Sequence, residues 1–95
     1  MAIIKKINNF SPKIGKNCFL AENSVLLGDV ILQENCTVWF NAILRGDVNY
    51  IRIGHSVNIQ DNAIVHGTYK KNPTIIGNRV SIGHGAIIHG CEISD

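Results

Sequence analysis

Three of the four histidines in this 95-residue chain, His66, His84 and His89, are each followed directly by a glycine. Neutral imidazole is among the commonest ligands that proteins offer to divalent metal ions such as zinc. His84 and His89 lie close together in the sequence, whereas His66 lies well upstream. Whether the three side chains can meet at one ion therefore depends on the elements that carry them.

Large aliphatic residues recur every six positions along most of the chain. Helices bury residues at spacings of three and four, and a plain strand buries every second residue, so neither explains this period. A short strand followed by a turn does explain it, if three such units complete one triangular coil. The anchors are Ile14, Leu20, Leu26, Leu32, Val38, Leu44, Ile53, Ile59, Val65, Ile76, Ile82 and Ile88, with wider steps after Leu44 and after Val65.

A small or β-branched residue stands four positions after nearly every anchor, which completes a hexapeptide repeat. We therefore predict an all-β protein, a parallel β-helix of about four coils that rises about 4.8 Å per coil. A single domain covers 1–95, with a cap strand in 1–13, coils in 14–93 and an exposed loop at 68–73. A bulged corner is expected within 47–52. The small positions are Cys18, Ser24, Val30, Cys36, Ala42, Val48, Val57, Ala63, Val80 and Ala86.

The composition excludes several classes of function. A net charge of +2 and a charged fraction of 17% indicate no basic face for nucleic acid. No apolar run reaches membrane-spanning length, and the N-terminus lacks a signal-peptide core, so we expect a cytoplasmic protein. Three dispersed cysteines indicate neither a disulfide scaffold nor a thiolate zinc cluster. Cys18 and Cys36 are expected to be free buried thiols stacked one coil apart, with a disulfide as the alternative.

Three units per coil place every third anchor on the same face. His66 and His89 then occupy equivalent positions on adjacent coils, with Cα atoms about 4.8 Å apart. Two parallel imidazoles at this separation can converge on one ion; a solvated pair without metal is the alternative. Glycines follow on this face in each coil, which indicates positive φ or a close approach of other groups to the backbone. They are Gly28, Gly46, Gly67 and Gly90.

His84 is expected to point away from the other two histidines. It stacks on Asp61, beside Gln60, on the neighbouring face of the coil. Within one subunit the three histidines should therefore not converge. In a three-fold oligomer, His84 of one subunit can meet His66 and His89 of the next. Three histidines with an open fourth position are the ligand set of a catalytic zinc site.

Other polar and aromatic positions have more than one interpretation. Arg45 and Asp47 could contact a neighbouring subunit or an anion, or form a solvated pair. Trp39 and Phe40 could pack at a subunit interface or form a platform for a ligand. His55 is expected to be a plain surface residue.

Four segments together resemble the gamma-class carbonic anhydrases and their close relatives, and the resemblance extends over roughly residues 10–93. It implies a left-handed β-helix and a homotrimer with a divalent metal between subunits, zinc first, with iron or cobalt as alternatives. His66 and His89 of one subunit and His84 of the next would bind it. The implied reaction is the reversible hydration of carbon dioxide to bicarbonate by a metal-bound hydroxide. The segments are WFNAILRGD at 39–47, NIQD at 58–61, VHG at 65–67 and IGHGAIIHG at 82–90.

The resemblance also implies roles for neighbouring side chains. Gln60 would hydrogen-bond the metal-bound water or bicarbonate, with Asn58 supporting it. Arg45, Asp47 and Asp61 would form charged contacts across the subunit interface.

The chain departs from this family pattern in two places. Members with the best-described activity carry proton-transfer glutamates in two regions, which in this chain read Gly67-Thr68-Tyr69 and Val48-Asn49. The family's further coils and C-terminal helix have no counterpart before Asp95, so we expect about four coils without that helix. The enzyme interpretation therefore has two alternatives. One is a hexapeptide acyltransferase or acetyltransferase that uses a histidine base without metal. The other is a non-catalytic trimeric scaffold that retains the metal site.

Overall fold

The computed structural model describes residues 2–95, whose regular secondary structure consists only of β-strands. These residues contain no helix long and apolar enough to cross a membrane. In chain order the strands are β1 (Ile3–Lys5), β2 (Lys13–Ile14), β3 (Phe19–Leu20), β4 (Val25–Leu32), β5 (Thr37–Val38), β6 (Ile43–Ile53), β7 (Asn58–Ile59), β8 (Ile64–His66), β9 (Thr74–Ile76), β10 (Ser81–Ile82), β11 (Ile87–His89) and β12 (Glu92–Ile93).

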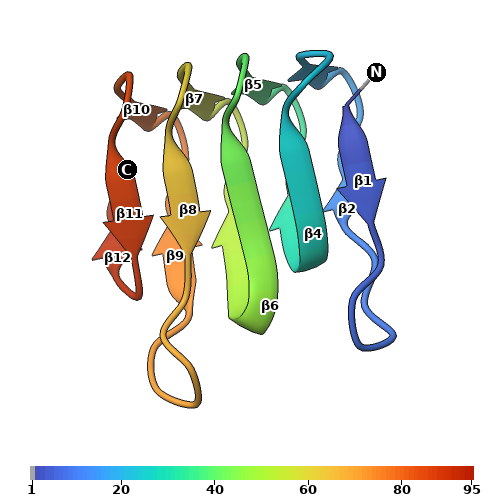
Figure 1. Cartoon of the computed structure of the whole chain (residues 1–95). Coiled ribbons are helices and arrows are strands. Elements are labelled where there is room, and N and C mark those ends of the chain that lie inside the picture. Colours follow the sequence, from blue (N-terminus) through green and yellow to red (C-terminus); the bar gives the residue numbers. More distant parts are fainter. Residues whose placement is uncertain (1) are drawn as a thin grey trace.

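The strands of successive coils stack in parallel and form the three faces of the β-helix (Figure 1). Face 1 consists of β1, the first halves of β4 and β6, then β8 and β11. Face 2 consists of β2, the second halves of β4 and β6, then β9 and β12. Face 3 consists of β3, β5, β7 and β10. The predicted fold class, a left-handed parallel β-helix of about four coils, is confirmed.

The predicted anchors line the interior of the coil. On face 1, for example, Leu26 pairs with Leu44, and Leu44 pairs with Val65 in the next coil. Removal of such side chains from water is the main favourable contribution to the folding free energy. Leu26, Leu32, Val38, Leu44, Ile53, Ile59, Val65, Ile76 and Ile82 are buried, and Ile14, Leu20 and Ile88 pack against them as partly buried residues.

The predicted column of small residues is wrong at Val48. Ile51 pairs with Val30 and is fully buried, whereas Val48 is only partly buried. Between Gly28–Gly46 and Val30–Ile51 the register shifts: four residues, 47–50, face the single residue Asp29, an excess of three. This confirms the expected bulged corner. The bulge also explains the error, because it moves the next inward position three residues along the chain.

Corners between the faces rely on left-handed backbone conformations, which asparagine and glycine tolerate best. Between faces 1 and 2, Gly28 and Gly90 have φ angles of 73° and 54°. A Cβ atom on Gly28 would also collide with the carbonyl oxygen of Gly46, so both expectations for this glycine stack hold there. Non-glycine corner residues with positive φ are Asn17, Asn35, Asn41, Ser56, Asn62 and Arg79.

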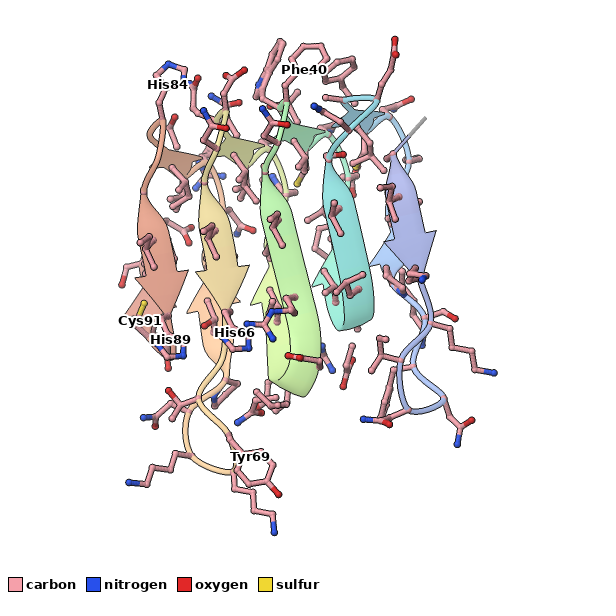
Figure 2. The ribbon with its side chains drawn as sticks, viewed as in Figure 1. Phe40, His66, Tyr69, His84, His89 and Cys91 are labelled. Carbon is pink, nitrogen blue, oxygen red and sulfur yellow. The ribbon has the colours of Figure 1, made fainter. Side chains whose placement is uncertain are left out.

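Two irregular segments extend from the regular coils. Residues 2–13 add β1 beneath β4, but Ile3 and Ile4 of β1 remain 48% exposed, so the expected apolar cap covers the end only in part. The loop at 67–73 links β8 to β9 and is closed by a hydrogen bond from the Thr68 amide to the Asn72 carbonyl (2.8 Å). Tyr69 projects from its tip (Figure 2). Residues 69–72 of this loop are exposed.

Cys18 and Cys36 are free thiols, as expected, but only Cys36 is buried and Cys18 is partly buried. The Cys18 thiol donates to the Gln33 carbonyl (3.3 Å), and the Cys36 thiol donates to the Gly54 carbonyl (3.2 Å). Burial raises the pKa of the Cys36 thiol. These cysteines therefore act as small core residues that also satisfy corner carbonyl groups.

Gly28→Ala should lower the free energy of unfolding by roughly 2–5 kcal/mol, because the new Cβ meets the next coil and the backbone φ is left-handed. Gly83→Ala is the matched control, since nothing lies within 4 Å of its Cβ position, and it should change stability by less than about 1 kcal/mol. Urea denaturation measures both. Equal effects at the two sites would contradict the tight stacking at Gly28.

Candidate metal centre

His66 and His89 end β8 and β11 on face 1, one coil apart, and pair directly in the strand register. Their imidazole rings stack with centroids 5.1 Å apart and planes inclined by only 5°. The predicted stacking of these histidines is therefore confirmed, although 22 residues lie between them in the sequence. Two parallel strands hold the rings in place, which is the rigid support that a binding site requires.

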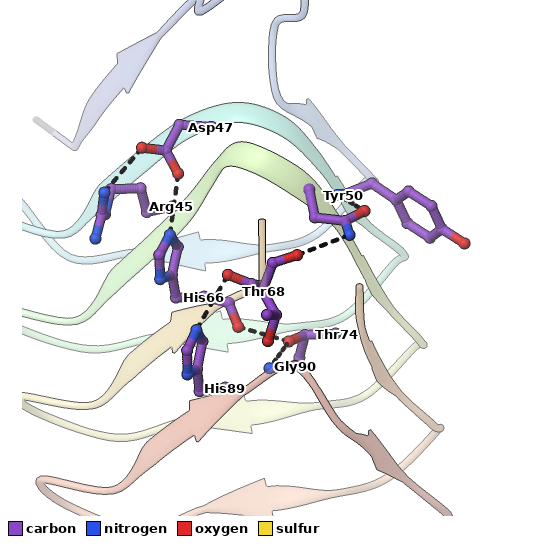
Figure 3. Close-up of polar contacts among 10 residues, drawn as sticks. Arg45, Asp47, Tyr50, His66, Thr68, Thr74, His89 and Gly90 are labelled. Atoms are coloured by element: carbon purple, nitrogen blue, oxygen red, sulfur yellow. Dashed lines mark hydrogen bonds and ion pairs between the residues drawn. The ribbon is translucent and has the colours of Figure 1, made fainter. Parts of the chain in front are cut away.

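Each ring nitrogen Nε2 has one polar neighbour (Figure 3). Nε2 of His66 lies 3.1 Å from Oδ1 of Asp47, and Nε2 of His89 lies 3.1 Å from the Gly67 carbonyl oxygen. Both rings therefore direct this nitrogen toward the bulge of β6 and the start of the 67–73 loop. Neutral imidazoles placed side by side are a donor set that suits zinc, iron(II) or cobalt(II).

Asp47 links the histidine pair to Arg45. Its Oδ2 accepts a hydrogen bond from the Arg45 guanidinium at 2.8 Å, while its Oδ1 faces His66. Desolvation is the largest single influence on the pKa of Asp47 and raises it. The hydrogen bonds from His66 and Arg45 outweigh that effect and hold this pKa below its ordinary value. Asp47 is therefore an ionised carboxylate at neutral pH that orients the His66 ring.

The bulge and the loop support each other next to this pair. Asn49 of the bulge donates from Nδ2 to the Thr68 carbonyl (3.1 Å), and its Oδ1 accepts from the Tyr50 amide (2.9 Å). The two departures from the six-residue repeat therefore meet at the histidines. Sequence reasoning found both departures but missed Asn49 as the contact between them.

His84 lies at the corner between faces 3 and 1, at the opposite end of the strands from His66 and His89 (Figure 2). Its side chain is 71% exposed, and its Nδ1 lies 3.3 Å from Oδ1 of Asp61. The predicted stack of His84 on Asp61 is confirmed, and so is its separation from the other two histidines. Within residues 2–95, no three His, Cys, Asp or Glu side chains gather closely enough to hold a metal ion.

Asn58 and Gln60 lie on the same side of the molecule as His84, on face 3 and at the corner that follows it. Oδ1 of Asn58 accepts hydrogen bonds from Thr37 Oγ1 and Trp39 Nε1, both at 2.7 Å. Trp39 in turn packs on Phe19, with ring centroids 5.0 Å apart. Within one chain, Asn58 therefore holds Trp39 in place. Gln60 lies just after the end of β7, directly before the Asp61 that contacts His84.

His55 lies away from the candidate ligands, as expected. Its Nδ1 lies 3.1 Å from Ser56 Oγ, at the corner between faces 2 and 3. It lines a surface hollow of about 350 Å³ on face 2 together with Arg52 and Asn78. None of the three candidate metal ligands lines this hollow.

An apolar ladder runs up the outside of face 1, directly beside the histidine pair. Its members pair in register from coil to coil, and Ile87 at the top is 71% exposed. Stacked exposed aliphatic side chains of this kind mark protein–protein contact surfaces. The apolar ladder consists of Ile3, Val25, Ile43, Ile64 and Ile87.

Asp47→Asn should destabilise the folded chain at neutral pH by up to about 1 kcal/mol, because it removes the charge held between His66 and Arg45. Folding lowers the pKa of Asp47, so its contribution is fully present above the ordinary value of 3.8 and is lost as the pH falls below that value. Urea denaturation at about pH 5 and about pH 3 should show the difference between wild type and variant shrinking. A constant difference would contradict a role for the charge.

Comparison with known proteins places the repeat and the histidines in a wider context. The protein-family model "Bacterial transferase hexapeptide (six repeats)" matches residues 11–46. A Methanocaldococcus jannaschii protein named "Probable carbonic anhydrase" is 54% identical over 82 residues, which cover 86% of this chain and 51% of that protein. "Gamma carbonic anhydrase 3, mitochondrial" of Arabidopsis thaliana is 44% identical over 91 residues, which cover 90% of this chain and 35% of that protein.

A solved structure shares the fold closely. The crystal structure of a hexapeptide transferase family protein from Anaplasma phagocytophilum matches with a TM-score of 0.89 at 38% identity, over 95% of this chain and 52% of that one. The chain spans about half the length, or less, of the curated relatives described above. Its repeat, its fold and these relatives together show that the chain belongs to the gamma-class carbonic-anhydrase-like family of hexapeptide-repeat proteins.

Proposed function

We propose that this chain forms a cytoplasmic homotrimer that binds a divalent metal, zinc in the first place, between subunits and hydrates carbon dioxide reversibly to bicarbonate. The observation that carries the proposal is the division of the histidines. His66 and His89 stack at one end of the strands, while His84 projects from the other end. Two ligands on one surface and one on another are what a cyclic assembly needs to complete a three-histidine site.

The surroundings of the histidines support a subunit contact on face 1. The apolar ladder runs beside His66 and His89 and leaves Ile87 largely exposed. His84 is itself exposed and flanked by Gly83 and Gly85, neither of which has a heavy atom within 4 Å of its Cβ position. An exposed ligand in open surroundings can be presented to a neighbouring subunit without moving the backbone.

The chemistry follows from the donor set. A divalent cation held by three neutral imidazoles would act as a Lewis acid and lower the pKa of coordinated water towards about 7. Asp47 would keep the His66 ring oriented. Gln60 would arrive with His84 from the neighbouring subunit, where its amide can hydrogen-bond substrate or product. The Arg45 guanidinium, partly exposed beside the pair, would attract the bicarbonate anion.

Proton removal from this site would depend on the solvent. The loop after His66 presents Tyr69, Lys70 and Lys71, none of which carries a carboxylate. The nearby Asp47 is already engaged by Arg45 and His66. The proposed reaction would therefore be limited by proton transfer to buffer molecules.

A second candidate function comes from the similarity to hexapeptide transferases. The matching family model and the Anaplasma phagocytophilum structure are both described as hexapeptide transferases. A transferase of this class would bind an acyl donor such as coenzyme A and use one histidine as a general base without metal. Saturable coenzyme A binding in a calorimeter, together with failure to bind metal, would favour this alternative. A metal-binding trimer with neither activity would favour a scaffold.

His84→Ala should abolish the proposed site. It removes one of three direct ligands, so metal affinity and hydration rate should fall by more than about 100-fold, the upper range for losing an outer-shell partner. Native mass spectrometry, elemental analysis and stopped-flow carbon dioxide hydration on purified trimer measure these quantities.

The matched control for this experiment is His55→Ala, a surface histidine outside the proposed site, which should keep metal and activity. A wild-type trimer with full metal occupancy and no hydration would rule out the proposed reaction. An unaffected His84→Ala variant would rule out the proposed ligand set.

Turnover of the metal-loaded trimer should rise with the concentration of an imidazole-type buffer at constant pH and ionic strength. Tyr69→Glu should weaken that dependence and raise turnover in dilute buffer by up to about 100-fold, because it adds a carboxylate to the loop after His66. Tyr69→Gln, which adds no titratable group, is the control. Buffer-independent turnover in the wild type would show that another internal group carries the proton.

A further inference from the structure

We infer that Thr74 is a positioning residue for the candidate metal centre, because its buried hydroxyl holds the backbones that carry His66 and His89 at one spacing. The inference rests on the proposed function, since it concerns metal binding by these histidines. Thr74 is the first residue of β9, and its hydroxyl forms hydrogen bonds with backbone groups rather than with the imidazole rings of the candidate ligands. Its effect must therefore act through the backbone.

The Thr74 hydroxyl bridges the His66 carbonyl and the Gly90 amide (Figure 3). Oγ1 of Thr74 donates to the His66 carbonyl oxygen at 2.7 Å and accepts from the Gly90 amide at 2.9 Å. The Gly90 amide also donates to the same His66 carbonyl, at 2.9 Å. His66 and Gly90, the residue after His89, are thus joined both directly and through Thr74.

This bridge lies where the strand ladder stops. On face 1, the pairing of β6 with β8 ends at Arg45 and His66, and the pairing of β8 with β11 ends at His66 and His89. The 67–73 loop leaves the coil directly after this point. The ladder resumes on face 2, where Ile51 pairs with Thr74. Without the hydroxyl, only the bond from the Gly90 amide to the His66 carbonyl would join the two backbones directly, beside the contact of the His89 ring with the Gly67 carbonyl.

The type of residue at position 74 supports a role beyond packing. Thr74 is fully buried, and its register partners in the coils below, Ile51 and Val30, are purely apolar. Valine has nearly the same shape as threonine, so packing alone does not require a hydroxyl there. A buried hydroxyl is unfavourable unless it is hydrogen-bonded, and here both its donor and its acceptor functions are used.

A metal site would feel this restraint strongly. Stacked rings whose centroids are 5.1 Å apart must place two nitrogens on one ion, and binding sites need their geometry held to about half an ångström. Loss of the hydroxyl would let the ends of β8 and β11 separate or slide. The expected result is weaker metal binding by a chain that still folds.

The experiment titrates Co²⁺ alone into the 95-residue protein and follows visible absorption, at a temperature where every variant is folded. Thr74→Val should weaken Co²⁺ binding by about 10–100-fold and alter the absorption spectrum, as loss of an outer-shell partner does. Thr74→Ser keeps the hydroxyl and should retain the affinity and spectrum of the wild type. If Thr74→Val does not fold, Thr74→Ala against Thr74→Ser gives the same test, since these two differ only in the hydroxyl.

Ile51→Val is the matched control, because it removes one buried methyl group from the same column one coil below. It should lower the thermal midpoint without changing Co²⁺ affinity or spectrum. If the wild type binds Co²⁺ and Thr74→Val binds it equally tightly with an unchanged spectrum, the inference is overturned while the proposed function stands. Failure of the wild type itself to bind Co²⁺ would remove the proposed metal site and the inference with it.

Discussion

The in-register stacking of parallel strands is the constraint on which the rest of this molecule depends. Each coil must repeat the path of the one below at the inter-strand spacing, so any position is copied directly above its equivalent. At the corners this requirement selects residues that tolerate left-handed backbone and close approach, such as Asn41 and Gly28. On the outer surface it aligns equivalent side chains of successive coils, as in the apolar ladder of face 1 and the His66–His89 pair.

The candidate site lies where this regularity is interrupted. The bulge at 47–50 and the loop at 67–73 both leave the coil between faces 1 and 2, next to the stacked histidines. A strictly regular coil offers only short strands and tight corners. The extra residues supply Asp47, which contacts His66. The return from the loop brings the Thr74 hydroxyl to the ends of β8 and β11. Departures from the repeat therefore provide the groups that orient the side chains, while the repeat provides their spacing.

This division explains what could be predicted from the sequence. Pairing of His66 with His89 could be predicted because it depends only on counting anchors, and both irregular steps leave the anchors recognisable. The separation of His84 followed from the same register. Val48 was misassigned because counting cannot show where inside a bulge the chain turns inward. The contacts of Asp47 with His66 and of Thr74 with Gly90 depend on the path of irregular backbone, which no periodicity encodes.

A site divided between surfaces ties metal binding to assembly. One chain presents two stacked imidazoles and, far from them, a third that is mostly exposed. If a neighbouring chain supplies the third ligand, each bound ion joins two subunits, and metal binding stabilises the oligomer by mass action. The reverse coupling must hold as well, since closing the ring raises the effective concentration of His84 at the pair on the next subunit. The apolar ladder would then favour association without fixing its geometry, because burial of apolar surface is non-directional. Three converging imidazoles would permit only one arrangement.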